Sequence, residues 1–129
     1  MATAKAKPRA IKVFSVSYKG IRLRVRVLPH AKDVYREFNG PDSRWLMRND
    51  LPEGFFNPFE AHNSKYVGEV VLAGNADLTE TVPHEVFHAV VYFYKTVGCI
   101  DDEPAAYAMG KLTSRILAKI GGTITLEGE

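Results

Sequence analysis

The chain has 129 residues, of which 46% are hydrophobic and 25% are charged. These values are typical of one globular domain, and they exclude both a wholly disordered chain and a chain with two sizeable cores. The formal net charge is only +2, and no stretch resembles a secretory signal or an 18-residue apolar span. We therefore expect a cytoplasmic protein without a membrane segment, in which the single Cys99 forms no intrachain disulfide.

The first regular pattern follows a short basic segment. Residues 1–9 mix Ala, Lys and Pro without periodicity, which predicts a disordered basic arm before a single domain over residues 10–129. From Ile11 to Leu28, apolar and polar residues alternate on either side of Lys19-Gly20, which predicts a β-hairpin with a two-residue turn. The predicted register pairs Tyr18 with Ile21, Val16 with Leu23 and Phe14 with Val25.

The other face of the predicted hairpin is basic. It carries Arg22, Arg24 and Arg26 together with serines. We favour the interpretation that this is the solvated outer face of a sheet. The alternative is a phosphate-binding stripe, so contact with nucleic acid through these arginines is the less favoured possibility.

Three different segments are predicted in the middle of the chain. Residues 30–38 predict a short helix that ends at Asn39-Gly40. Residues 41–65 hold three prolines and several aromatic side chains, which predicts an irregular segment that buries large rings. Residues 66–73 are rich in valine and are followed by Gly74-Asn75, so we expect a strand there, at the edge of the sheet.

Two helices are predicted in the last third of the chain. The first begins at Asp77, whose carboxylate can cap the first turn, and ends at Gly98. The second begins around Asp102 and Pro104 and ends at Gly121-Gly122. Residues 123–126 then add a short strand or fray. The predicted fold class is α+β, with a small twisted sheet of hairpin and edge strand packed on these two helices.

The first of these helices carries the most informative residues of the chain. His84 and His88 stand four apart and share one helix face, so both imidazoles can bind one cation, and Glu85 stands beside them. The pattern H-E-x-x-H predicts a Zn²⁺ site in which Glu85 is the general base and not a ligand. Two histidines and a buried glutamate without a partner would otherwise be costly in an apolar helix.

A third ligand must come from another part of the chain. The acidic cluster Asp101, Asp102 and Glu103 is the concentrated source of carboxylates downstream, and Glu103 is our choice, with the two aspartates as fallbacks. A full helix to Val97 would run about 14 Å past His88, while five linking residues return about 17 Å. The reach is strained unless the first helix ends early or the second crosses it steeply.

One turn after Glu103, Tyr107 shares its helix face and could donate a hydroxyl to a developing oxyanion. A half-buried core aromatic is an equally good interpretation of Tyr107. His30 and His62 are lone histidines in predicted loops or helix starts, and we regard them as bystanders that could at most donate a hydrogen bond to substrate.

These residues resemble a known superfamily. The motif at His84–His88, followed by residues 101–110 (DDEPAAYAMG), is similar to the glutamate-ligand branch of the zincin metallopeptidases. The chain is most similar to compact metallopeptidase-like proteins of bacteriophages and prophages, and more distantly to the ImmA/IrrE and SprT-like groups. The resemblance implies a minimal zincin-like fold, zinc ligands His84, His88 and Glu103, and catalytic Glu85.

The predicted function is therefore a zinc-dependent endopeptidase that hydrolyses a protein or peptide substrate through a zinc-bound water activated by Glu85. Its substrate is expected to pair with the strand at Val67–Ala73. The alternative is a non-catalytic zinc-containing binding or regulatory module, whose fourth ligand would be Cys99, His62 or Asp102 and whose contact surface would be the three arginines.

Overall fold

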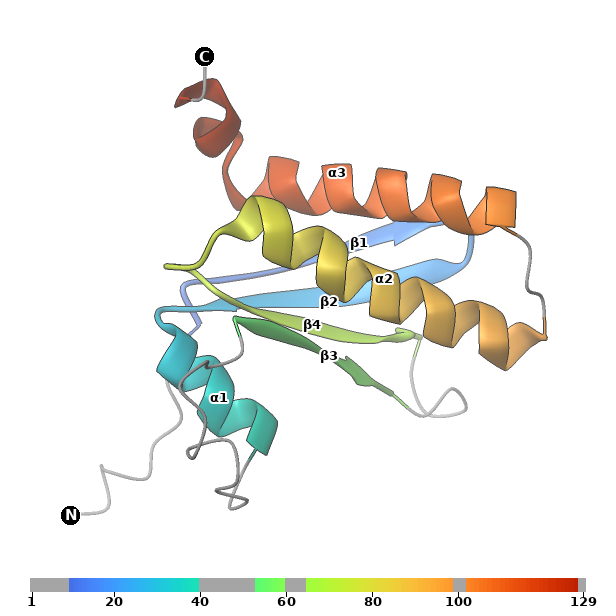
Figure 1. Ribbon diagram of the computed structural model, residues 1–129, viewed down its shortest axis with the longest axis horizontal. Coiled ribbons are helices and arrows are strands. Elements are labelled where there is room, and N and C mark those ends of the chain that lie inside the picture. Colours follow the sequence, from blue (N-terminus) through green and yellow to red (C-terminus); the bar gives the residue numbers. More distant parts are fainter. Residues whose placement is uncertain (1–9, 40–52, 60–64, 99–101, 128–129) are drawn as a thin grey trace.

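The computed structural model describes residues 10–39, 53–59, 65–98 and 102–127. It has an α+β fold in which a four-stranded sheet carries two long helices on one face and a short helix on the other (Figure 1). The elements are β1 (Lys12–Tyr18), β2 (Ile21–Leu28), α1 (Ala31–Asn39), β3 (Gly54–Pro58), β4 (Gly68–Ala73), α2 (Leu78–Val97) and α3 (Asp102–Glu127).

The N-terminal hairpin has the predicted register. Antiparallel β1 and β2 pair Tyr18 with Ile21, Val16 with Leu23 and Phe14 with Val25. Lys19 and Gly20 both have positive φ, at 46° and 89°, as a two-residue turn that matches the strand twist requires. The alternation of apolar and polar residues around the Lys19-Gly20 turn therefore predicted the register of this hairpin correctly.

The order of the strands differs from the predicted one. It is β1-β2-β4-β3, with β4 parallel to β2 and antiparallel to β3. The prediction that residues 66–73 form an edge strand is wrong, because β4 has a neighbour on both sides. Full burial of all six β4 residues agrees with an inner position, since such strands read as continuous apolar runs.

The strand at the edge is β3, within the segment that we predicted to be irregular. Residues 54–58 pair with β4 from Gly54 opposite Leu72 to Pro58 opposite Gly68. Proline is tolerated on an edge strand because its missing N–H can face away from the ladder. The aromatic pair Phe55-Phe56 between a glycine and that proline was the signal for a strand.

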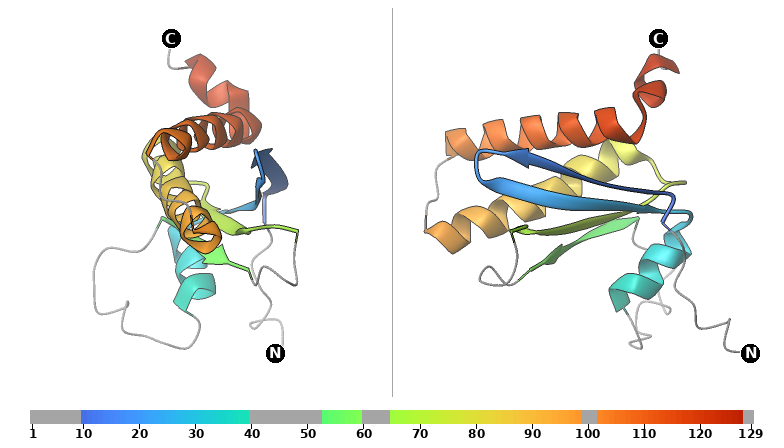
Figure 2. Two further views of the ribbon diagram at one scale, coloured as in Figure 1. Left: turned by 90° about the vertical axis from the view of Figure 1, so that its right-hand side faces the viewer. Right: turned by 180° about the vertical axis from the view of Figure 1, so that it is seen from behind.

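The two sides of the sheet are covered differently (Figure 2). Helices α2 and α3 pack on one face and share its largest core cluster, to which each contributes fully buried residues such as Val86 and Leu112. Helix α1 packs on the opposite face over Leu28 and Val71. Hence α2 has one side against the sheet, one flank against α3 and one side in solvent.

The helix ends follow the sequence signals. Asp77 accepts a hydrogen bond from the Thr79 backbone N–H and caps α2, and Gly98 ends that helix with φ of 76°. Helix α3 is interrupted at Gly121, but the chain beyond is helical to Glu127, so the predicted short strand or frayed end is not what the structure has. In the described segments, none of the helices has the length and apolarity needed to cross a bilayer.

Two glycines are expected to respond oppositely to the same substitution. A Cβ on Gly68 would lie 2.5 Å from the Asn57 carbonyl oxygen and 2.5 Å from the Phe56 ring, whereas a Cβ on Gly110 in α3 meets nothing within 4 Å. We expect Gly68→Ala to lower the free energy of unfolding by about 1–3 kcal/mol through overpacking. Gly110→Ala should raise it by about 0.5–1 kcal/mol, because alanine favours a helix interior. Urea unfolding of both variants measures this, and equal changes would contradict the packing at Gly68.

Candidate metal centre

The two motif histidines lie together on the solvent side of α2. Their Nε2 atoms are 3.3 Å apart, and the two rings meet edge to face with centroids 4.9 Å apart. Two imidazole nitrogens bound to one tetrahedral zinc at 2.0–2.1 Å would be separated by about 3.3–3.4 Å. The pair therefore has the spacing that a shared metal ion requires.

Glu85 lies against the interior beside this pair. It is 5% exposed, and its Oε2 is 3.9 Å from His84 Nε2, whose side chain is 67% exposed. Burial raises the pKa of the Glu85 carboxyl above its ordinary value, and the nearby His84 lowers it in part. A carboxylate that binds its proton more tightly than usual is better suited to take a proton at neutral pH.

The raised pKa of Glu85 predicts a pH dependence of stability. The folded chain binds this proton more tightly than the unfolded chain, so the stabilising contribution is complete below pH 4.5 and is lost as pH rises through the folded pKa. We expect metal-free wild type to lose stability relative to metal-free Glu85→Gln as pH rises above about 4.5. Urea unfolding of both proteins across this range measures the difference, and parallel curves would show that burial does not perturb Glu85.

The motif also lies beside the edge strand. Thr81 on α2 donates a hydrogen bond to Glu53, which directly precedes β3, at 3.1 Å. Three turns along α2, Tyr92 packs on Phe56 with ring centroids 5.8 Å apart. Residues 81, 85, 88 and 92 recur at helical spacing and share this flank of α2, so Glu85 and His88 lie between the two contacts. This bordering strand, β3, lies in the segment that the sequence predicted to be irregular.

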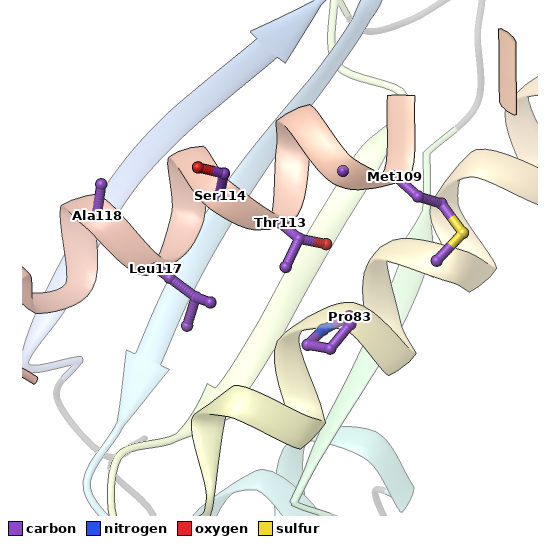
Figure 3. A pocket seen from close by; sticks show the side chains of 7 residues that line it. Pro83, Met109, Thr113, Ser114, Leu117 and Ala118 are labelled. Carbon is purple, nitrogen blue, oxygen red and sulfur yellow. The ribbon is translucent and has the colours of Figure 1, made fainter. Parts of the chain in front are cut away.

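Helix α3 lies on the other flank of α2. Met109, Thr113 and Leu117 point toward Pro83 across a groove of about 660 Å³ (Figure 3). The two helices lie closest near the start of α2 and separate toward the end where α3 begins (Figures 1 and 2). Glu103 precedes Met109 by six residues, about 9 Å of helix axis, and so lies toward that diverging end.

This arrangement does not bring the predicted third ligand to the histidines. Helix α2 continues to Val97, the case in which the return to His88 is strained. Glu103 and Asp102 are exposed in the first turn of α3, and among the described residues no group of three or more His, Cys, Asp and Glu side chains is placed to hold a metal ion. Glu103 as zinc ligand stays a prediction. Asp101, His62 and Cys99 lie outside the described residues.

Tyr107 is 63% exposed on α3. That exposure excludes the interpretation of Tyr107 as a half-buried core aromatic, and its role as an oxyanion donor stays a prediction. His30 is an exposed residue directly before α1, which covers the face of the sheet away from α2 and α3. It is therefore separated from the motif by the sheet.

The predicted basic face is largely engaged within the protein. Arg24 and Arg26 form ion pairs with the buried Glu69 at 3.3 and 2.9 Å, and Arg26 also pairs with Glu37 at 3.1 Å. Burial would lower the pKa of Arg26, but its hydrogen bonds to the two glutamates outweigh this and raise it. These internal pairs leave less positive charge for a phosphate backbone than the sequence alone indicates.

The chain was also compared with protein families, curated proteins and solved structures. No family model, no curated protein and no solved structure matches it. Function is therefore inferred from the geometry of the motif and its surroundings.

Proposed function

We propose that the protein is a zinc-dependent metallopeptidase of the H-E-x-x-H type that acts on a protein or peptide substrate in the cytoplasm. The observation that carries the proposal is the 3.3 Å separation of His84 Nε2 and His88 Nε2 next to a buried Glu85 of raised pKa. A helix that placed these residues for packing alone would have no need of paired, exposed imidazoles.

The chemistry divides between the metal and one side chain. A zinc ion held by His84 and His88 would supply Lewis-acid polarisation of water and of the substrate carbonyl. Glu85 would take the proton from the attacking water and pass it to the leaving nitrogen of the peptide bond. Its raised pKa suits both transfers, because the carboxyl holds the proton between them. Glu103 would complete the zinc site if the start of α3 closes toward His88 when the metal binds, and Tyr107, one turn later, would then donate its hydroxyl to the developing oxyanion.

The edge of β3 supports a peptide as the substrate. In an antiparallel ladder, alternate residues turn their backbone groups away from the partner strand, and in the described part of the chain no strand lies on that side of β3. The Phe59 N–H donates to the Val67 carbonyl, and the Glu53 carbonyl accepts from the Ala73 N–H, so the odd-numbered residues turn their backbone groups toward β4. Phe56 is even-numbered, and its backbone groups therefore point outward. An extended peptide could pair there, alongside the flank of α2 that carries Glu85.

The decisive experiment joins zinc analysis to cleavage profiling. Purified protein, loaded with one equivalent of zinc and freed of excess metal, is incubated with a proteome-derived peptide library, and new termini are identified by mass spectrometry. Zinc-dependent cleavage that a chelator abolishes supports the proposal. Retention of stoichiometric zinc without any new termini would favour the non-catalytic zinc module instead, and no retained zinc would contradict both.

A further inference from the structure

A hollow of about 430 Å³ opens on α2 directly beyond His88. Its lining residues are His88, Val91, Tyr92, Lys95 and Thr96. Tyr92 also contacts the β3 end of the sheet, through the Phe56 ring at 5.8 Å and the Phe59 carbonyl at 3.4 Å. The hollow therefore adjoins both the motif and the edge strand.

The polar side chains that line the hollow differ in whether they have a partner within the protein. The Tyr92 hydroxyl donates to the Phe59 carbonyl, and the Thr96 hydroxyl donates to the Tyr92 carbonyl at 2.8 Å. No carboxylate in the described segments forms an ion pair with the exposed Lys95. Within residues 10–39, 53–59, 65–98 and 102–127, the Lys95 ammonium is thus a donor without a partner, and Val91, 37% exposed, provides an apolar wall beside it.

We propose that this hollow, the Lys95 subsite, binds an acidic side chain of the substrate. The proposal rests on the proposed peptidase function and names its specificity. A lysine ammonium is a compact point charge that attracts a carboxylate, and a glutamate or aspartate can lay its methylene groups against Val91. Specificity of the peptidase would then come from α2 itself, one to two turns after the metal-binding histidines.

The direction of β3 sets which substrate residue enters the subsite. Residue 53 lies beside Thr81, and residues 56 and 59 lie beside Tyr92, so β3 runs in the same direction as α2. A peptide paired antiparallel to β3 runs the opposite way, which places its N-terminal part toward Lys95. Lys95 follows His88 by about 10 Å of helix axis, and its side chain points back along the helix. At about 3.3 Å per residue, the acidic side chain precedes the cleaved bond by about two residues.

The test compares peptides that differ only in Glu or Lys at each position around one cleaved bond. We measure kcat/KM for wild type, Lys95→Gln and Lys95→Glu. Dissociation constants for the same peptides are measured by fluorescence anisotropy with the zinc-loaded Glu85→Gln protein, alone and combined with Lys95→Gln or Lys95→Glu. Wild type should favour the peptide with Glu over the peptide with Lys about fivefold in kcat/KM, at a single position that lies about two residues before the cleaved bond. Lys95→Gln should remove this preference and Lys95→Glu should reverse it. Lys32→Glu, an equal charge change on α1, should leave it unchanged.

The outcomes separate this proposal from the proposed function. Cleavage without an acidic preference, or with a preference that Lys95→Glu leaves intact, would overturn the Lys95 subsite and keep the peptidase. Absence of cleavage would contradict the peptidase. The anisotropy series would still decide whether Lys95 selects an acidic ligand. If no peptide bound in that series, the Lys95 subsite would be overturned as well. A carboxylate in the subsite could come from an acidic side chain or from the C-terminus of a peptide. Peptides with a free and with an amidated C-terminus distinguish the two, and a preference that requires the free C-terminus would contradict the side-chain assignment.

Discussion

Glu85→Gln is expected to lower kcat/KM for peptide hydrolysis by about 10²–10⁴-fold while the protein stays folded and keeps its zinc. Glutamine has nearly the same shape but cannot take a proton from water. Glu85 is 5% exposed and is assigned no role in holding the metal, so the substitution changes proton transfer with little change in packing. Initial rates on the best peptide from cleavage profiling, together with zinc content, measure the effect.

Glu80→Gln is the matched control for this variant. Glu80 is exposed in the first turn of the same helix and lies one turn before the motif. Its substitution removes one carboxylate of equal charge and should leave kcat/KM within about twofold of wild type, because the charge is screened by solvent. Equal rates for Glu85→Gln and wild type would show that another group accepts the proton.

His84→Ala and His88→Ala should each reduce retained zinc from one equivalent to nearly none, with loss of hydrolysis. Each removes one of two imidazoles whose Nε2 atoms are 3.3 Å apart, and the remaining nitrogen cannot hold the ion alone. His84 is largely exposed, so its loss should hardly change the stability of the metal-free fold. Dialysis against a weak chelator followed by elemental analysis gives the zinc content, and His30→Ala on the opposite side of the sheet is the control.

The same measurement on Glu103→Ala tests the third ligand. A loss of zinc equal to that of His84→Ala would require the start of α3 to close toward His88 when metal binds, because the two helices separate at that end (Figure 1). Equal zinc content in Glu103→Ala and wild type would remove Glu103 from the site. A group outside the described residues, such as Asp101 or His62, would then take its place.

Local signals predicted the local structure well. The hairpin register followed from the Lys19-Gly20 turn and the alternation around it, since any other register would have mixed the two faces. Asp77 and Gly98 marked the two ends of α2 because a side-chain cap and a left-handed residue satisfy the backbone groups there. The pair of His84 and His88 followed from the helix period alone.

What the sequence did not predict depends on contacts between distant segments. The inner position of β4 comes from parallel pairing with β2. The valine-rich run at residues 68–73 is typical of a strand with both faces buried, but it does not identify the strands on either side. The strand β3 was hidden by Pro58, which weakens a strand pattern unless an edge position is already known. The position of Glu103 depends on how α3 crosses α2, which helix periodicity does not determine.

The parallel pairing of β2 with β4 also bears on how the site is assembled. Val25 pairs with Val70, so this contact joins residues 45 positions apart and must wait for a large loop to close. Only a short turn, Gly74 to Asp77, separates β4 from α2, so the helix that carries His84 and His88 docks when that strand does. Formation of the metal centre and completion of the sheet are therefore expected to be one kinetic event, and the rate of zinc capture during refolding would report the slowest step of folding.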